Sequence, residues 1–245
     1  MTSPSSPRRR PLLLLCGDSL TQRGSELEFG GWVVLLQQAY VRSVDVVNRG
    51  LSGYNTRWFW ELALPAIRAD LQHSLAPSLI TLWLGANDAA LAIGPAQSQH
   101  VPVDEYKQNL TVIIQEFQRL APTSKILVIT PPVLDDDHRH RIRMRDFGAS
   151  VSDPTDRTNE QARAYAQACV ETVAHLDGVS VLDMHAVLMA QYPDNLDRAK
   201  LLSDGLHFSK EGNRVVFEQI ERRIRSLLPE ELMDTWQLPD WKTLV

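Results

Sequence analysis

Five short runs of apolar residues recur along the chain, separated by longer amphipathic segments. They cover residues 11–16, 44–47, 79–84, 125–130 and 179–182. The runs hardly alternate with polar residues, which is typical of strands that are covered on both faces of a parallel sheet. The pattern therefore predicts five buried parallel strands.

The segments between these runs carry apolar residues at helical spacing. Three stripes stand out: Tyr106, Leu110, Ile113, Ile114, Phe117 and Leu120; Ala162, Ala166, Cys169, Val173 and Leu176; and Val216, Ile220, Ile224 and Leu227. We expect Ser209 to cap the helix of the third stripe. Alternating strands and helices predict an α/β fold, namely a three-layer α/β/α sandwich around a five-stranded parallel sheet with right-handed crossovers.

The chain contains no internal repeat and no Gly/Ser-rich linker, so we expect one domain over residues 11–228. Residues 1–10 are polar and end in three arginines, and the apolar run that follows is too short for a secretion signal. We interpret them as a disordered tail. Residues 134–157 are polar and alternate in charge, which predicts an irregular loop.

The C-terminal stretch, residues 229–245, contains two prolines together with Trp236 and Trp241. This composition suggests an ordered tail that packs on the domain's own surface or on a partner subunit, the second case being a homodimer. The sequence leaves both arrangements open.

Composition narrows the function classes. The formal net charge of −5 gives no electrostatic reason to expect nucleic acid or an anionic membrane as a partner. No stretch approaches the roughly 18 apolar residues of a membrane span. The two cysteines, Cys16 and Cys169, lie in apolar segments, which favours buried free thiols and a cytoplasmic location.

Four polar segments that contain glycine lie where ligands bind in open parallel sheets, at the carboxyl ends of strands. Residues 17–21, 48–55 and 85–88 follow the first three predicted strands, and residues 203–208 precede the last helix. We expect these four segments to converge at one edge of the sheet.

The residue types in these segments suit acyl transfer. Ser19 can act as a nucleophile if a base takes its proton, and His207 suits that role because histidine ordinarily titrates near pH 6.5. Asp204 precedes His207 by three residues, and a tight turn through Gly205 could bring the carboxylate to the ring and fix its tautomer. The sequence thus predicts Ser19, His207 and Asp204 as catalytic residues.

Ester attack creates an oxyanion that needs hydrogen-bond donors. Three candidates are the backbone N–H groups of Ser19 and Gly53 and the side-chain amide of Asn87. Asp18 and Asp88 flank these residues, and we expect them to fix the loops by hydrogen bonds rather than to react.

Other polar residues have simpler interpretations. Residues 135–140 could suggest a metal site, but the arginines that follow repel a cation, so we favour a solvated or self-paired loop without metal that could wall the acyl pocket. Four further histidines are interpreted as surface residues or as satisfied by hydrogen bonds: His73, His100, His175 and His185.

The four segments together resemble the SGNH (GDSL-type) hydrolase superfamily. The matching blocks are Gly-Asp-Ser-Leu at 17–20, Gly53, Gly-Ala-Asn-Asp at 85–88, and the pair Asp204 and His207. Within it, residues 17–21, 48–56 and 84–89 resemble the isoamyl acetate-hydrolysing esterases. The resemblance implies a flavodoxin-like sheet, no cofactor, and hydrolysis of short acyl esters of small molecules.

Alternatives remain open at this point. The same machinery would serve a deacetylase, a thioesterase or a lysophospholipase, and the fold could carry a catalytically idle binding protein. A phosphate- or nucleotide-binding module is disfavoured, because no Gly-x-x-x-x-Gly-Lys or Gly-x-Gly-x-x-Gly loop follows the first strand.

Overall fold

The five predicted strands form one parallel sheet in a computed structural model, which describes residues 10–147, 150, 155–228 and 237–244. The strand order is β2-β1-β3-β4-β5, the flavodoxin-like order. The strands are β1 (Leu12–Gly17), β2 (Asp45–Gly50), β3 (Leu79–Trp83), β4 (Lys125–Ile129) and β5 (Val179–Leu182). The predicted α/β sandwich is confirmed, but the expectation of five buried strands is wrong for the two edge strands, β2 and β5, which are mostly only partly buried.

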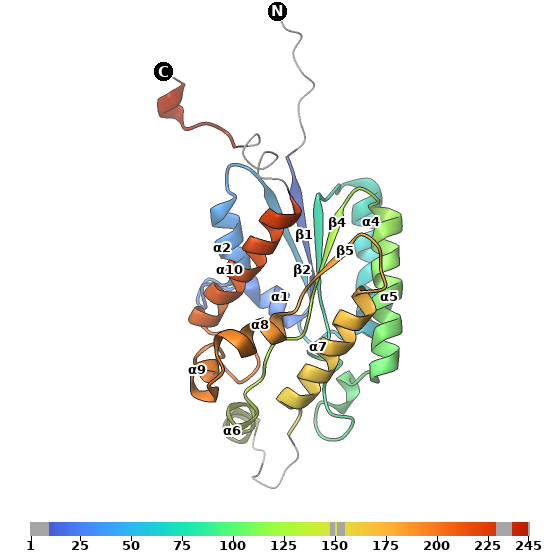
Figure 1. Ribbon diagram of the computed structural model, residues 1–245, viewed down its shortest axis with the longest axis vertical. Coiled ribbons are helices and arrows are strands. Elements are labelled where there is room, and N and C mark those ends of the chain that lie inside the picture. Colours follow the sequence, from blue (N-terminus) through green and yellow to red (C-terminus); the bar gives the residue numbers. More distant parts are fainter. Residues whose placement is uncertain (1–9, 148–149, 151–154, 229–236, 245) are drawn as a thin grey trace, which may run out of the picture.

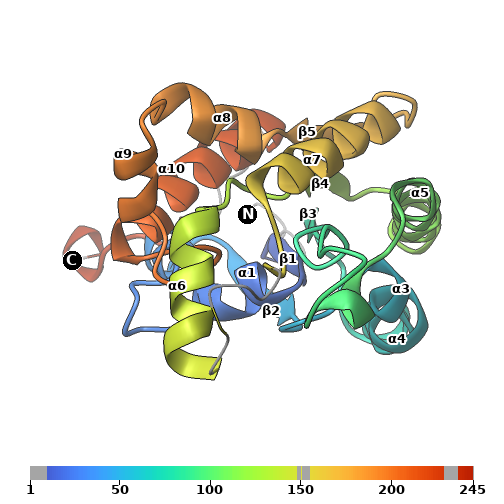
Figure 2. The ribbon, with the colours of Figure 1, turned by 90° about the horizontal axis from the view of Figure 1, so that it is seen from below.

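Helices cover both faces of this sheet (Figure 1), and the view from below separates the two layers (Figure 2). One face packs against α2 (Trp32–Ala39), α8 (Met184–Gln191) and α10 (Lys210–Leu227). The other packs against α4 (Leu64–His73), α5 (Val103–Leu120) and α7 (Asn159–Val173). Four further helices lie in the connections: α1 (Ser19–Gln22), α3 (Thr56–Trp58), α6 (Asp136–Phe147) and α9 (Asn195–Lys200).

Strand β1 contributes to both hydrophobic cores. Leu13 and Leu15 belong to the core under α2 and α10, whereas Leu14 and Cys16 belong to the core under α5 and α7. All four side chains are fully enclosed. Because successive residues of a strand face opposite sides, covering both faces requires the continuous apolar run seen in the sequence.

The three predicted stripes lie on helices that face the sheet. Their residues are buried or partly buried, and only Leu176 lies beyond the end of its helix, α7. Ser209 caps α10 as predicted, its Oγ accepting the N–H of Gly212 at 3.2 Å. The cap and the apolar stripe together fix where α10 begins and which side it buries.

Both cysteines are free and buried in the same core, as predicted. Burial raises the pKa of the Cys16 thiol well above its ordinary value and that of Cys169 to about 12. Both thiols are therefore protonated at neutral pH.

The prediction of an irregular loop over residues 134–157 is wrong for α6. Its first turn is stabilised by Asp135, whose carboxylate accepts the N–H of His138 at 2.8 Å, and acidic residues begin the helix while Arg145 lies in its last turn. The stretch is also less solvated than expected, because Arg143 and Arg157 are buried.

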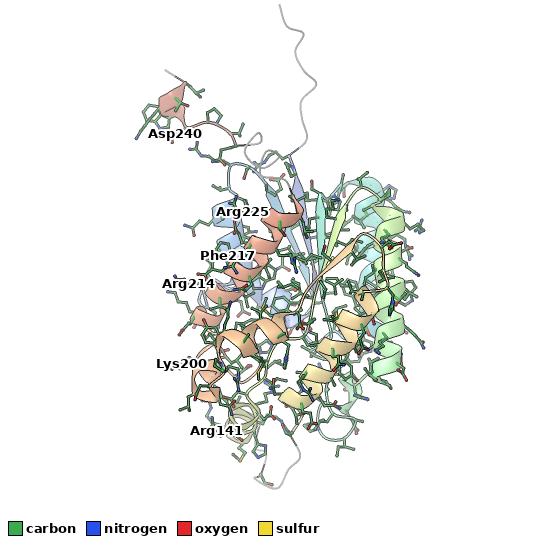
Figure 3. The ribbon with its side chains drawn as sticks, viewed as in Figure 1. Arg141, Lys200, Arg214, Phe217, Arg225 and Asp240 are labelled. Carbon is green, nitrogen blue, oxygen red and sulfur yellow. The ribbon has the colours of Figure 1, made fainter. Side chains whose placement is uncertain are left out.

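The C-terminal residues 237–244 contact the body of the protein through Arg42. Its guanidinium donates to the carbonyl of Pro239 at 3.0 Å and pairs with Asp240, labelled in Figure 3. Trp241 is 67% exposed, which disfavours, of the two arrangements left open by the sequence, the one in which this tryptophan seals the domain's own surface. Trp236 and the predicted N-terminal tail up to residue 9 lie outside the described residues, and the homodimer stays a prediction.

No helix in the described part of the chain combines the length and the apolar character needed to cross a membrane.

Candidate active site

Ser19 lies at the carboxyl end of β1, where the strand turns into α1. Asp18 caps this helix, its Oδ1 accepting the N–H of Leu20 at 2.9 Å. Gly17 permits the turn: a Cβ there would lie 2.2 Å from Thr21 Oγ1 and 2.6 Å from the carbonyl of Trp83. The tight strand-to-helix turn therefore holds the Ser19 hydroxyl in one place, with the residue only 4% exposed.

Asp204 and His207 come together in a turn that follows α9. One carboxylate oxygen of Asp204 accepts the backbone N–H groups of Leu206 at 3.0 Å and His207 at 2.7 Å, which closes the turn. Gly205 supplies the positive φ of 80° that the turn requires. The other carboxylate oxygen lies 2.7 Å from Nδ1 of His207. The expected turn geometry is confirmed.

The ring of His207 bridges Asp204 to Ser19. Its Nε2 lies 2.9 Å from the Ser19 hydroxyl, although the two residues are 188 positions apart. Burial alone would raise the pKa of Asp204, but the hydrogen bond and charge of His207 outweigh it and hold that pKa well below its ordinary range. An ionised carboxylate can only accept, so Nδ1 carries the ring proton and Nε2 is free to accept the proton of Ser19.

The three predicted oxyanion donors gather around the same cavity. The backbone N–H groups of Ser19 and Gly53 have no acceptor among the described residues. The amide nitrogen of Asn87 donates one hydrogen to the carbonyl of Tyr54 at 2.9 Å, which leaves its second hydrogen available. Gly53 has φ of 84°, a backbone conformation in which glycine is strongly favoured.

A cavity of about 600 Å³ opens over Ser19 and His207. It is bounded on one side by residues after β2 and β3, and on the other by α6 and the segment before α7. Its lining comprises Ser19, Ser52, Gly53, Trp58, Asn87, Pro95, Ala96, Ser98, Gln99, Arg139, Arg143, Asp156, Arg157, Leu206 and His207. Four of these residues belong to the 134–157 stretch, namely Arg139, Arg143, Asp156 and Arg157. The expectation that this stretch walls the pocket is therefore confirmed.

Asp18 and Asp88 make the loop-fixing hydrogen bonds that were expected of them. Asp88 accepts the backbone N–H of Thr56 at 3.0 Å and its hydroxyl at 2.5 Å, which ties the loop after β3 to the start of α3. Burial raises the pKa of Asp18 to about 7 and that of Asp88 to about 6. Both carboxyl groups are enclosed beneath the site rather than exposed to a ligand.

Arg157 is a site residue that sequence reasoning missed. It is only 3% exposed, and its guanidinium donates to the carbonyl of Ala86 at 3.0 Å, the side-chain oxygen of Asn87 at 2.9 Å, and the carboxylate of Asp156 at 2.8 Å. Arg139 pairs with Asp156 at 2.9 Å and lies 3.6 Å from the Asp204 carboxylate. No local pattern marks Arg157 as a site residue, because Ala86 and Asn87 lie about seventy residues away from it in the sequence.

The other histidines lie where they were expected. His73 and His175 are exposed, the Nδ1 of His100 lies 2.6 Å from the carbonyl of Ala90, and the Nε2 of buried His185 lies 3.2 Å from the Asn159 side-chain oxygen. None of the four lines the cavity over Ser19.

Comparisons with known proteins place this geometry in context. The sequence model of the GDSL-like Lipase/Acylhydrolase family matches residues 15–215, which include all four predicted segments. A GDSL esterase/lipase of Arabidopsis thaliana is 40% identical over 225 residues, covering 91% of this chain and 90% of that protein. The isoamyl acetate-hydrolyzing esterase 1 homolog of Rattus norvegicus is 37% identical over 237 residues, covering 95% and 87%.

Solved structures share the fold. A putative platelet activating factor from Streptococcus pneumonia matches with a TM-score of 0.64 and 23% identity, covering 89% of this chain and 86% of that one. An acetyl xylan esterase matches with a TM-score of 0.65 and 19% identity, covering 87% and 99%. At these identities the likeness shows a common architecture.

Proposed function

Since the chain belongs to the GDSL-like lipase/acylhydrolase family and is a carboxylic-ester hydrolase, we propose that it hydrolyses short-chain, acetate-type esters through an acyl-enzyme on Ser19. His207 acts as the base and acid, and Asp204 orients it. The observation that carries the proposal is the unbroken hydrogen-bond chain from the Asp204 carboxylate through the imidazole to the Ser19 hydroxyl, at 2.7 and 2.9 Å.

The first half of the reaction transfers the acyl group to the enzyme. Nε2 of His207 takes the proton of Ser19 as its oxygen bonds to the carbonyl carbon. The N–H groups of Ser19 and Gly53 and the amide of Asn87 stabilise the oxyanion that forms. The carbon–alkoxy bond then breaks, and the departing alcohol takes the proton from His207.

The second half returns the enzyme to its starting state. Water gives a proton to His207 and attacks the acyl carbon, which forms a second oxyanion in the same place. The bond to Ser19 breaks, its oxygen regains the proton from His207, and the carboxylic acid leaves. The imidazole of His207 carries every proton in this cycle, and no atom changes its oxidation state.

Two measurements test the nucleophile. The variant S19A should lose all but about 0.1% of its turnover of p-nitrophenyl acetate, because removing a triad member costs at least a thousandfold. A fluorophosphonate probe should label the native protein on Ser19 and fail to label S19A. Turnover above about 1% in a folded S19A, or labelling at another residue, would remove Ser19 from this role.

The polar lining of the cavity favours a second candidate, the removal of acetyl groups from a polyhydroxylated compound such as a sugar. Ser52, Ser98 and Gln99 line the cavity together with three arginines and can hydrogen-bond hydroxyl groups, while Trp58 offers an aromatic surface. Comparing kcat/KM for isoamyl acetate and for an acetylated xylose distinguishes the two. A ratio of tenfold or more in favour of the sugar would make deacetylation the better description.

A further inference from the structure

The amide orientation of Asn87 decides whether this side chain can stabilise an oxyanion. A carboxamide has one end that accepts and one that donates, and a half-turn about its last bond exchanges them. Only the orientation with the nitrogen toward the cavity supplies a donor. Asn87 is 3% exposed, so water does little to select between the two.

Arg157 distinguishes the two orientations. A guanidinium has only donors, and its Nη2 lies 2.9 Å from the Oδ1 of Asn87. The reversed amide would set N–H groups against this cation and would also set its oxygen against the carbonyl of Tyr54, which now accepts from the amide nitrogen at 2.9 Å. Two repulsions would thus replace two hydrogen bonds.

Arg157 is itself held firmly. Its Nε donates to the carbonyl of Ala86, the residue directly before Asn87, and its Nη1 pairs with Asp156. Asp156 is buried and receives a second ion pair from Arg139. The guanidinium therefore contacts the backbone and the side chain of the same short loop, and its Nη2 also donates to the side-chain oxygen of Gln99, whose nitrogen donates to the carbonyl of Gly53 at 3.0 Å. Ala86, Asp156 and Gln99 together fix the position of Arg157.

We propose that Arg157 is a positioning residue for ester hydrolysis, which locks the Asn87 amide with its nitrogen toward the developing oxyanion. The inference rests on the proposed function, because it assigns Asn87 to the oxyanion. The positive charge on the oxygen side of the amide also polarises it, which makes the opposite N–H a stronger donor. Arg157 acts through Asn87 and takes no part in proton transfer.

A double-mutant cycle tests this dependence. We expect N87A to lower kcat by about 10²–10³-fold, the usual cost of one lost oxyanion donor, and R157A to lower it by about 10–10²-fold with little change in KM. If Arg157 acts through Asn87 rather than through Gln99 and the Gly53 loop, adding R157A to N87A should lower kcat by less than about twofold further. The proposal would be overturned if the kcat loss of N87A/R157A equalled the product of the two single losses, or if R157A changed only KM. Arg157 would then be a structural or substrate-binding residue.

Three controls separate positioning from loss of structure. R198A removes another buried arginine, which donates to the carbonyls of Tyr192 at 2.6 Å and Pro193 at 2.7 Å outside the cavity, and should leave kcat unchanged. Guanidinium ion at tens of millimolar should restore activity to R157A but leave N87A/R157A as it is. R157K retains a cation for Asp156 without the planar fork, and it carries the same cycle if R157A does not fold. Full kcat in R157K, or equal rescue of both backgrounds, would contradict the proposal.

Failure of this inference is distinguishable from failure of the proposed function. If S19A is inactive but the Arg157 and Asn87 losses multiply, only the positioning role falls. If S19A retains turnover, the proposed acyl-enzyme on Ser19 is refuted, whatever the result of the double-mutant cycle.

Discussion

The substitution D204N tests the orientation of His207 with a minimal change of shape. Oδ1 of Asp204 accepts two backbone N–H groups, from Leu206 and His207, and an asparagine oxygen can accept both. The turn should therefore keep its form. The change falls on the other atom, which now accepts from Nδ1 of the ring at 2.7 Å and would become an amide nitrogen that only donates.

The imidazole of His207 must then change its tautomer. Facing a donor, Nδ1 has to be unprotonated, so the proton moves to Nε2, which lies 2.9 Å from the Ser19 hydroxyl. A protonated Nε2 cannot take the serine proton. Flipping the amide would not help, because its nitrogen would then face two backbone N–H groups.

The expected loss in kcat is about 10⁴-fold, which is the effect of this substitution in a Ser-His-Asp triad. It corresponds to about 5 kcal/mol of activation free energy. Initial rates with p-nitrophenyl acetate measure it, and thermal unfolding of D204N and the native protein shows whether the fold is kept. A folded D204N that retained more than about 10% of kcat would refute the assigned role of Asp204.

Two further predictions concern buried charge and backbone geometry. Burial raises the pKa of Asp18 from 3.8 to about 7, so between these values the folded protein holds a proton that the unfolded chain has released, and stability falls as the pH rises through this window. D18N keeps an acceptor for Leu20 and removes the charge, so its melting temperature relative to the native protein should rise from pH 5 to pH 8; a constant difference would contradict the buried-charge argument. Gly205 and Gly178 have φ of 80° and 73°, so alanine should cost either position about 1–2 kcal/mol of stability. Only at Gly205 would a Cβ also meet backbone, lying 2.5 Å from the nitrogen of Arg139, so G205A should lower kcat about tenfold or more while G178A leaves it unchanged. Equal kcat values in the two variants would show that the turn tolerates the shift.

The sheet and the triad could be predicted because their signals are local. Strand β1 must be apolar at every position to be covered on both faces, and the chemistry follows immediately at Ser19. Likewise, Asp204 and His207 share one turn, so their spacing alone predicted their contact. The remaining step, bringing that turn to Ser19, followed from a general rule about the carboxyl ends of parallel strands.

Helix α6 and Arg157 could not be predicted in the same way. The helix contains few apolar residues, so no hydrophobic periodicity predicts it. It is stabilised instead by capping and by ion pairs such as that of Arg139 with Asp156. The acidic start and the arginine in its last turn were a usable signal, since they match the helix dipole. Arg157 had none, because its contacts with Ala86 and Asn87 span about seventy residues of sequence.

The two enclosed cysteines make the protein convenient to label. Cys16 and Cys169 are the only thiols in the sequence, and both are buried and protonated at neutral pH. Maleimides, which react with exposed thiolates, should therefore not modify the folded protein, and should modify both cysteines once it unfolds. A fluorophore could thus be attached through a cysteine introduced at the rim of the cavity without first removing the native pair.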